Sequence, residues 1–342
     1  MIKARVTAAL GALALVGCGN AAPSPQLQIV GSSTVYPFTT AVAERFVQNH
    51  PSFLSPIVES TGTGAGLKLF CNGVGANYPD MTNASRRIKK GEVESCRKNG
   101  VNRIIEVPVG IDGLVLIEAK NAQPLNLTTA DVYEALAANP YGQQQTARTW
   151  ADVNPSLPAI PIQMYGPPPT SGTRDSFAEL VLEKGCDSNP AMKALKEQDS
   201  DRHKDICTKI REDGVFIEAG ENDNLLVQKV SGNPGALGVL GFSFLEENLD
   251  RVKAVQLNGV DPSVGTISDL SYPGARQIYI YAKGEHVGVV PGMKEFLAEY
   301  AKGWQPDGYL ALRGLIPSPP AVRAQATQAA IQLAPLDPST VK

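Results

Sequence analysis

Apolar residues along the chain fall into short β-rich runs, each followed by a polar turn and then by a segment with helical spacing. The run 26–30 precedes a helix expected at about 37–48, and the run 57–59 precedes a helix expected at about 65–73. Because strand, turn and helix follow one another repeatedly, the pattern predicts βαβ units and a largely parallel sheet.

Two positions in this pattern indicate that the chain passes between two lobes. The apolar runs 104–109 and 114–117 are separated by the flexible sequence Gly110-Ile111-Asp112-Gly113, where we expect the first crossing. The sequence Ser271-Tyr272-Pro273-Gly274 precedes an expected strand at 277–282, and the chain is expected to return there.

A chain of 342 residues is long enough for two lobes of ordinary domain size. We expect 26–110 together with 276–342 to form lobe I and 111–275 to form lobe II. The expected fold is α/β, with helices flanking mainly parallel or mixed sheets. Further helices are expected at 129–138, 176–184, 292–303 and 321–332.

The first 18 residues have the pattern of an export signal. The apolar stretch 6–16 is well short of the roughly 20 residues that a membrane span needs. It ends in Leu15-Val16-Gly17-Cys18, which resembles the bacterial lipobox, whose cysteine is acylated and becomes the mature N-terminus. An ordinary cleaved signal, with Ala21-Ala22 at the cleavage site, is the alternative. We expect 19–25 to form a tether and the protein to lie in the periplasm or cell envelope.

The five cysteines fit an oxidising compartment. If Cys18 carries lipid, the other four allow three pairings, and sequence proximity favours Cys71 with Cys96 and Cys186 with Cys207. A metal site is the alternative, but the chain lacks a C-x-x-C pair and shows no ligand-spaced histidine near them. We therefore predict two disulfides and no metal.

Composition limits the class of partner. Charged residues make up 19% of the chain, the net charge is −3, and the 31 Lys and Arg residues form no long run. Since a basic stripe is the usual mark of a nucleic-acid-binding protein, no nucleic acid is expected as a partner. Bulk charge cannot attract an anion either, so any anion site must be local.

Three turns place small hydroxylated residues directly before an expected helix: Ser32-Ser33-Thr34, Thr61-Gly62-Thr63-Gly64 and Thr170-Ser171-Gly172-Thr173-Arg174. Each turn could simply cap its helix, because Ser and Thr are preferred N-caps. Each has more hydroxyls than a cap needs, however. Unpaired N–H groups at helix starts, glycines that permit close approach, and the charge of Arg174 would together hold a tetrahedral oxyanion.

No pattern typical of a catalytic site stands out. The glycines of 62–66 fit neither a P-loop nor a dinucleotide motif, and the chain has no G-x-S-x-G or H-E-x-x-H sequence. The only histidines are His50, His203 and His286, and we expect each at the surface rather than in a catalytic role. The sequence therefore predicts a binding protein without a cofactor, and not an enzyme.

The ordered set of motifs resembles a known family. VGSSTVYPF (30–38), STGTGAG (60–66) and TSGTRDSF (170–177) are similar to motifs of the phosphate-binding proteins of phosphate ABC transporters, and NPGALG (233–238) and YPG (272–274) also fit. The resemblance covers nearly the whole mature chain. It implies a two-lobed periplasmic binding protein fold of type II, in which phosphate is held dehydrated in the cleft between the lobes.

The resemblance also implies which residues bind the anion. The ligands of the family and the residues next to them fall here on Ser32, Ser33, Thr34, Thr63, Gly64, Ser171, Gly172 and Thr173, at the starts of three helices.

The chain departs from the family pattern at two positions. Some members have an aspartate where this chain has Ser85, and a carboxylate there can accept a proton from phosphate and so exclude sulfate. Ser85 keeps a hydrogen bond without the charge. Those members also have an arginine where this chain has Pro167, so Arg174 is expected to supply the positive charge, with Arg86 as a second candidate.

We therefore expect a monomeric protein that captures inorganic phosphate in the cell envelope and delivers it to the permease of an inner-membrane ABC transporter. Two alternatives stay open. One is a binding protein for another tetrahedral oxyanion, such as sulfate, molybdate or arsenate. The other is an envelope phosphohydrolase or a phosphate-sensing protein on the same scaffold.

Overall fold

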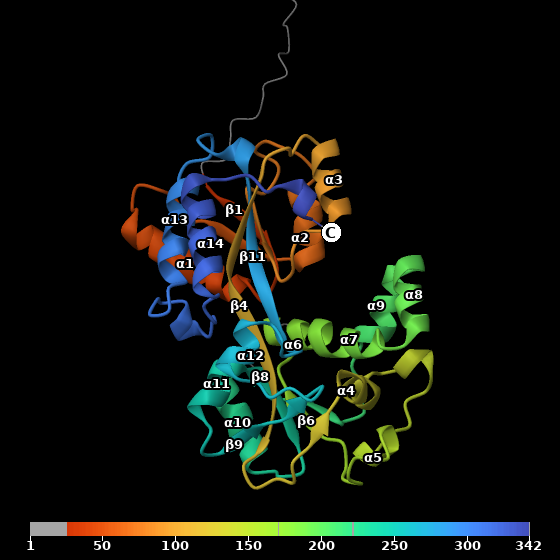
Figure 1. The fold of residues 1–342 in the computed structure, drawn as a ribbon. Coiled ribbons are helices and arrows are strands. Elements are labelled where there is room, and N and C mark those ends of the chain that lie inside the picture. Colours follow the sequence, from red (N-terminus) through yellow and green to blue (C-terminus); the bar gives the residue numbers. More distant parts are fainter. Residues whose placement is uncertain (1–25, 170, 221, 342) are drawn as a thin grey trace, which may run out of the picture.

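The computed structural model describes residues 26–169, 171–220 and 222–341. The expected signal 1–18, with Cys18, and the expected tether 19–25 lie outside the described residues. Figure 1 shows two lobes, one above the other, joined by the long strands β4 (Ile104–Ala119) and β11 (Ala275–Lys283). The predicted α/β fold, with mixed sheets and flanking helices, is confirmed.

Lobe I, the upper lobe in Figure 1, contains short parallel strands, with β1 (Gln28–Gly31) between β2 (Ile57–Ser60) and β3 (Met81–Ala84). The strand β11 pairs antiparallel with both β3 and β4. Helices were predicted near most of the positions where they occur, with ends that differ by a few residues. The helices of this lobe are α1 (Tyr36–Asn49), α2 (Thr63–Phe70), α3 (Lys90–Lys98), α13 (Met293–Gly303) and α14 (Pro320–Gln332).

Close packing at the end of β1 fixes the loops that follow β1 and β2. Gly31 has φ +126°, in a region that favours glycine. A Cβ on Gly66 would come within 2.4 Å of the Cα of Gly31, so a larger residue at 66 would push α2 away from β1. The two glycines therefore allow the start of α2 to lie directly against the end of β1.

The strand β4 is continuous through both lobes, so the flexible break predicted at 110–113 is absent from it. Its first half pairs with β11, and its second half pairs with β8 (Leu237–Gly241) and β9 (Val252–Ala254). A Cβ on Gly110 would come within 2.5 Å of Leu315, and one on Gly113 within 2.7 Å of Ile316. These glycines serve close packing, which is why a turn-like sequence belongs here to an extended strand.

In lobe II the sheet continues from β8 to β6 (Met164–Gly166) and β7 (Phe216–Glu218). The strands β5 (Asn126–Leu127) and β10 (Gln256–Leu257) pair separately. The helix predicted at 176–184 is part of a longer helical segment made of α6 (Gly172–Phe177), the π-helical turn η2 (Ala178–Leu182) and α7 (Glu183–Cys186).

Shorter elements complete the described chain. The remaining α-helices are α4 (Thr129–Leu136), α5 (Trp150–Val153), α8 (Pro190–Gln198), α9 (Ser200–Thr208), α10 (Asp223–Ser231), α11 (Phe242–Glu247) and α12 (Val264–Ser268). The 3₁₀ turns are η1 (Pro140–Gly142), η3 (Gly284–His286), η4 (Ala311–Arg313) and η5 (Pro338–Thr340). No helix of the described residues is both long and apolar enough to span a membrane.

Each lobe has its own apolar core. One cluster of buried side chains belongs to lobe II and includes Trp150, which has 0% of its surface exposed. Two further clusters belong to lobe I, and one of them includes Trp304. Burial of such a large apolar side chain stabilises a lobe by roughly 1.5–3 kcal/mol. Separate cores are what hinge motion between two lobes requires.

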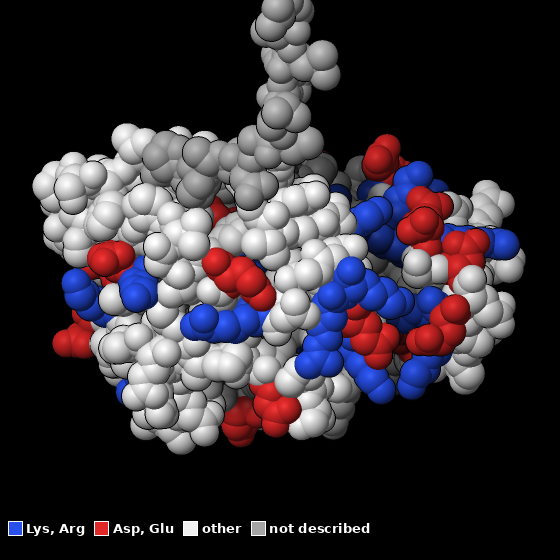
Figure 2. Space-filling view, turned by 90° about the horizontal axis from the view of Figure 1, so that it is seen from above, with Lys and Arg blue, Asp and Glu red and all other residues white. Residues whose placement is uncertain are grey.

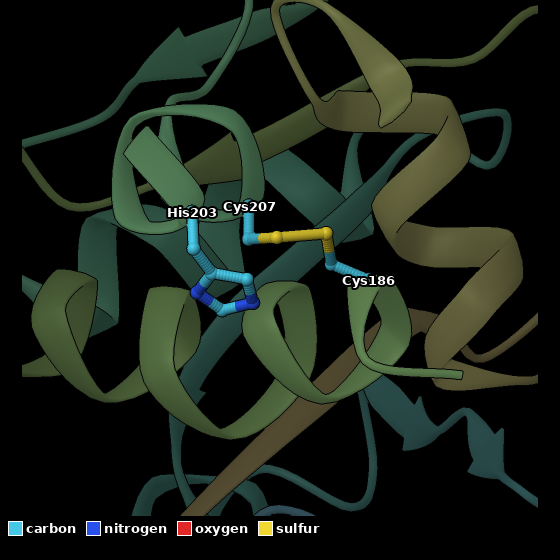
Figure 3. Close-up of side chains that lie close together, drawn as sticks. All are labelled: Cys186, His203 and Cys207. Atoms are coloured by element: carbon cyan, nitrogen blue, oxygen red, sulfur yellow. A yellow bond between two sulfur atoms is a disulfide. The ribbon is translucent and has the colours of Figure 1, made fainter. Parts of the chain in front are cut away.

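Two disulfides are present, Cys71–Cys96 and Cys186–Cys207, which are the pairings favoured by the sequence. Figure 3 shows the ring of His203 beside the second disulfide, where no histidine was expected. Because the two sulfurs are bonded to each other, they are not thiolates. The group is therefore a disulfide with a neighbouring histidine rather than a set of metal ligands.

The prediction that all the histidines lie at the surface is wrong for two of them. His203 is 2% exposed and His286 is 3% exposed. Asp187 Oδ1 lies 2.8 Å from Nε2 of His203, and Asp80 Oδ1 lies 2.6 Å from Nδ1 of His286. A carboxylate partner allows each ring to be buried, because its polar atom stays hydrogen-bonded.

Candidate anion-binding site

Three connections between a strand and a helix meet between the lobes: loop 1 from β1 to α1, loop 2 from β2 to α2, and loop 3 from β6 to α6. Because β1 and β2 are parallel neighbours, loops 1 and 2 lie at the same edge of the sheet. Loop 1 also touches lobe II. The Thr34 hydroxyl donates to the Gly172 carbonyl at 3.3 Å, and a Cβ on Gly172 would come within 2.8 Å of the Ser33 carbonyl oxygen.

The hydroxyl groups of loops 1 and 2 do not cap their helices. The N-cap residues are Val35 for α1 and Gly62 for α2, and neither makes a side-chain capping hydrogen bond. Ser171 differs, because it is the N-cap of α6 and its Oγ accepts from the Thr173 N–H at 3.2 Å. The capping interpretation therefore holds for one turn and fails for the other two, where Ser33, Thr34 and Thr63 have other partners.

A further hydroxyl comes from the turn after β3. Thr63 Oγ1 lies 2.8 Å from Ser85 Oγ and accepts a hydrogen bond from the Ser85 N–H at 3.0 Å. Thr63 is 7% exposed and Ser85 is 2% exposed. Since β3 also pairs with β1, this turn reaches the same edge of the sheet as loops 1 and 2.

Arg276, which sequence reasoning missed, connects these elements. It is 8% exposed and lies on β11 opposite Asp112 of β4. Its Nη2 donates to Thr34 Oγ1 at 2.8 Å and to Ser176 Oγ at 2.6 Å. Its Nε donates to Asp112 Oδ2 at 3.2 Å. One guanidinium therefore links loop 1, α6 and both strands that join the lobes.

A sequence signal for this pair did exist. Asp112 is the only charged residue in the flexible sequence between two apolar runs, and Arg276 directly precedes an apolar strand. Both segments had been assigned to crossings between the lobes. Opposite charges in two segments expected to lie side by side could have been read as partners.

Two carboxylates on the α6–η2 segment reach serines of the opposite lobe. Asp175 accepts a hydrogen bond from Ser33 Oγ, and Glu179 accepts one from Ser85 Oγ at 3.2 Å. Glu179 Oε2 also accepts from Nη1 of Arg276. Because positions 175 and 179 are four residues apart, their side chains lie on the same side of the helical segment.

The two arginines proposed from the sequence make their hydrogen bonds elsewhere, although the charge of Glu179 is among the influences that raise the pKa of Arg86. The guanidinium of Arg174 lies 4.2 Å from the centroid of the Phe216 ring and donates to the Pro167 carbonyl at 3.0 Å. Burial lowers the pKa of Arg174 from its ordinary value. Arg86 donates to both carboxylate oxygens of Glu92, at 2.8 and 3.0 Å. The cation in contact with the site hydroxyls is therefore Arg276.

Charges on the face shown in Figure 2 are mixed. Lys and Arg side chains (blue) lie beside Asp and Glu side chains (red) there, and no broad area of that face is covered by Lys and Arg alone. A broad positive field over that face therefore does not attract an anion, and binding has to rely on local groups.

The assembled groups have the chemistry of an oxyanion site. Hydroxyls can donate hydrogen bonds to oxygen, and a guanidinium donates several bonds in a fixed plane while it neutralises charge. The two carboxylates can accept a proton that the ligand carries. The site therefore combines several donors, one central cation and two acceptors.

Comparison with known proteins identifies the family. A sequence profile described as a PBP superfamily domain matches residues 18–302. SphX of Synechococcus elongatus is 36% identical over 307 residues, which cover 87% of this chain and 79% of SphX. The phosphate-binding protein PstS of Staphylococcus saprophyticus is 28% identical over 90% of this chain and 88% of its own.

Solved structures agree with this assignment. A possible phosphate binding protein from Planctomyces limnophilus has a TM-score of 0.70 and 28% identity, covering 91% of this chain and 99% of its own. An ABC-type phosphate transport receptor from Vibrio cholerae has a TM-score of 0.53 at 20% identity, over 80% of this chain and 98% of its own, which shows the fold alone. The predicted type II fold is thereby confirmed, and family membership confirms a binding protein rather than an enzyme. The chain belongs to the PBP superfamily, as a member of the family that contains SphX and the phosphate-binding protein PstS.

Proposed function

We propose that this protein captures inorganic phosphate in the cell envelope and delivers it, as a monomer, to the permease of an inner-membrane ABC transporter. The observation that carries the proposal is the meeting of hydroxyl groups from both lobes at the buried guanidinium of Arg276. The name of the related PstS, a phosphate-binding protein, supports phosphate as the ligand.

In this proposal the anion lies among loops 1 and 2, the turn after β3 and the start of α6. Arg276 supplies the positive charge, because its contacts join these elements whereas Arg174 and Arg86 have partners elsewhere. The hydroxyls that now contact carboxylates and one another would donate to phosphate oxygens instead. The proposed ligands are Ser32, Ser33, Thr34, Thr63, Gly64, Ser85, Ser171, Gly172, Thr173 and Arg276.

Closure of the lobes would complete the site. We take 26–110 with 276–342 and 111–275 as the two moving units, linked by β4 and β11. An anion that accepts hydrogen bonds from both units stabilises their closed arrangement, and that arrangement is the form that a permease would recognise. Affinity would come from hydrogen bonds formed in a cleft without bulk water.

Acylation of Cys18 would hold the protein at the membrane surface. Incorporation of labelled palmitate into the full chain, and its loss in Cys18→Ser, is the expected result. Labelled fatty acid that persists in Cys18→Ser, or none in either protein, would contradict the anchor.

Calorimetric titration of the purified protein with phosphate and with sulfate tests the proposed function. We expect phosphate to bind more tightly than sulfate. Thr34→Val should weaken phosphate binding roughly tenfold and Arg276→Lys roughly 100-fold, because charge-assisted hydrogen bonds are lost. Arg313→Gln, which removes an exposed arginine that pairs with Glu44 outside the site, should bind like the wild type. Equal binding of sulfate, or no binding of phosphate, would refute the proposal.

A further inference from the structure

Glu179 occupies an unusual position for a carboxylate in an anion site. Its Oε2 accepts hydrogen bonds from Ser85 Oγ at 3.2 Å and from Nη1 of Arg276. Ser85 belongs to lobe I, Arg276 to a linking strand, and Glu179 to the helical segment of lobe II. A single carboxylate oxygen therefore lies where the three parts of the site meet.

Glu179 is not the only carboxylate that pairs with Arg276. Asp112 Oδ2 already lies 3.2 Å from Nε of Arg276 and also accepts from Ser176 Oγ at 2.9 Å. The guanidinium of Arg276 therefore has two carboxylate neighbours, Asp112 and Glu179, before any ligand arrives. The charge of Arg86 acts on Glu179 as well. An anion that enters the site still meets the Glu179 carboxylate at close range, and like charges repel.

The repulsion depends on whether the anion carries a proton. An oxyanion with an O–H group can donate that hydrogen to a carboxylate, which replaces a repulsive contact by a short charge-assisted hydrogen bond. A fully deprotonated anion such as sulfate has only acceptor oxygens, so its oxygen and the carboxylate would face each other without a proton between them. Ser85 cannot discriminate in this way, because a hydroxyl both donates and accepts.

We propose that Glu179 is the specificity-determining residue of the site, which admits tetrahedral oxyanions that carry a proton and rejects those that do not. The ligand class is thus a protonated oxyanion, such as hydrogen phosphate. The turn after β3 provides a hydroxyl at Ser85 and no carboxylate, and the acceptor reaches it from the opposite lobe. This inference rests on the proposed function and assigns its selectivity to one side chain.

A purely mechanical role for Glu179 makes a different prediction. If its contact with Ser85 only holds the lobes together, its removal weakens every anion by the same factor. If it accepts the proton of the ligand, its removal lowers phosphate affinity and raises sulfate affinity. The ratio of the two affinities therefore distinguishes selection from closure, whatever happens to either affinity alone.

Glu183 provides a matched control. It lies on the same helical segment, four residues beyond Glu179, and its carboxylate pairs with Lys196 outside the site. Glu183→Gln removes a negative charge from this segment and leaves Ser85 and Arg276 untouched. It should therefore leave the ratio of phosphate to sulfate affinity close to that of the wild type.

The experiment is calorimetric titration of the full chain and its variants with inorganic phosphate and with sulfate near neutral pH. We expect Glu179→Gln to lower the phosphate-to-sulfate ratio by roughly 10- to 100-fold, the value of one charge-assisted hydrogen bond. Glu179→Asp, which keeps the charged carboxylate, should retain more of the preference than Glu179→Gln, whose amide can donate to sulfate as well as accept from phosphate. Far-ultraviolet circular dichroism checks that each variant is folded.

Two results separate the possible failures. A wild-type protein that binds phosphate with preference, together with an unchanged ratio in Glu179→Gln, overturns the role of Glu179 and leaves the proposed function intact. A wild-type protein that does not bind phosphate, or that binds sulfate as tightly as phosphate, overturns the proposed function and the inference with it.

Discussion

Glu118 offers a test of the structure that does not depend on any ligand. It lies on β4 in lobe II, and its side chain is 3% exposed. Nζ of Lys253, on the neighbouring strand β9, is 3.6 Å from Oε1, while Oε2 has no hydrogen-bond partner among the described residues. Burial raises the pKa of Glu118 from 4.5 to about 7, although the charge of Lys253 opposes the shift.

The sign of the effect on stability follows from the raised pKa. Between about pH 4.5 and pH 7 the folded protein keeps a proton on Glu118 that the unfolded chain has released. The free energy of unfolding therefore falls as the pH rises through this range, and it stays lower above it. The difference in pKa corresponds to about 3 kcal/mol.

Glu118→Gln removes the titration and keeps the shape of the side chain. We expect the stability of this variant, relative to the wild type, to increase by up to about 3 kcal/mol between about pH 5 and pH 8. Urea unfolding, followed by circular dichroism at both pH values, measures the difference. Glu247→Gln, at an exposed position on α11, is the control and should show no comparable change. A constant difference between Glu118→Gln and the wild type would refute the reasoning.

Three further predictions concern the site and its support. Arg276→Ala should reduce phosphate affinity more than Arg174→Ala does, because only Arg276 contacts hydroxyls of loop 1, and titration of both variants checks the order. Gly172→Ala should weaken phosphate binding at least tenfold, because its Cβ would come within 2.8 Å of the loop 1 backbone and keep the lobes apart. Small-angle scattering in the presence of phosphate should then show a less compact protein than the wild type. Replacing Cys186 and Cys207 together by serine should lower the free energy of unfolding by roughly 3 kcal/mol, because the bridge closes a loop with a sequence separation of 21. Thermal unfolding with and without reductant measures this loss.

Much of the fold could be predicted from the sequence because it is encoded locally. The helix predicted at 37–48 is one residue shorter than α1 at each end, and the strand predicted at 57–59 is one residue shorter than β2. Each combines a clear apolar period with glycine, proline or polar residues at its ends. The disulfide pairings were also local, since each joins cysteines that are near in sequence.

The parts that could not be predicted depend on contacts between distant segments. Gly110 and Gly113 look like a turn, but Leu315 and Ile316 pack where their side chains would be. His286 looks exposed in a glycine-rich segment, but Asp80, far away in sequence, pairs with its ring.

The site was predicted in part for the same reason. The hydroxylated turns are short motifs that can be recognised one at a time. The charge of Arg276 can be matched to that of Asp112 from the sequence, but its contacts with Thr34 and Ser176 cannot, because these partners come from separate regions of the chain. An arginine at a strand start carries little information by itself.

The pairing of Arg276 with Asp112 across β11 and β4 has a consequence for evolution and for engineering. The cation of the site stands on the strands that connect the lobes, so a change in the backbone there alters the fraction of molecules that are open without touching a ligand contact. The apparent affinity of a protein with two states depends on that fraction. Substitutions at Gly113, the neighbour of Asp112 on β4, should therefore change the phosphate concentration at which half of the protein is occupied, while the ligand contacts stay the same.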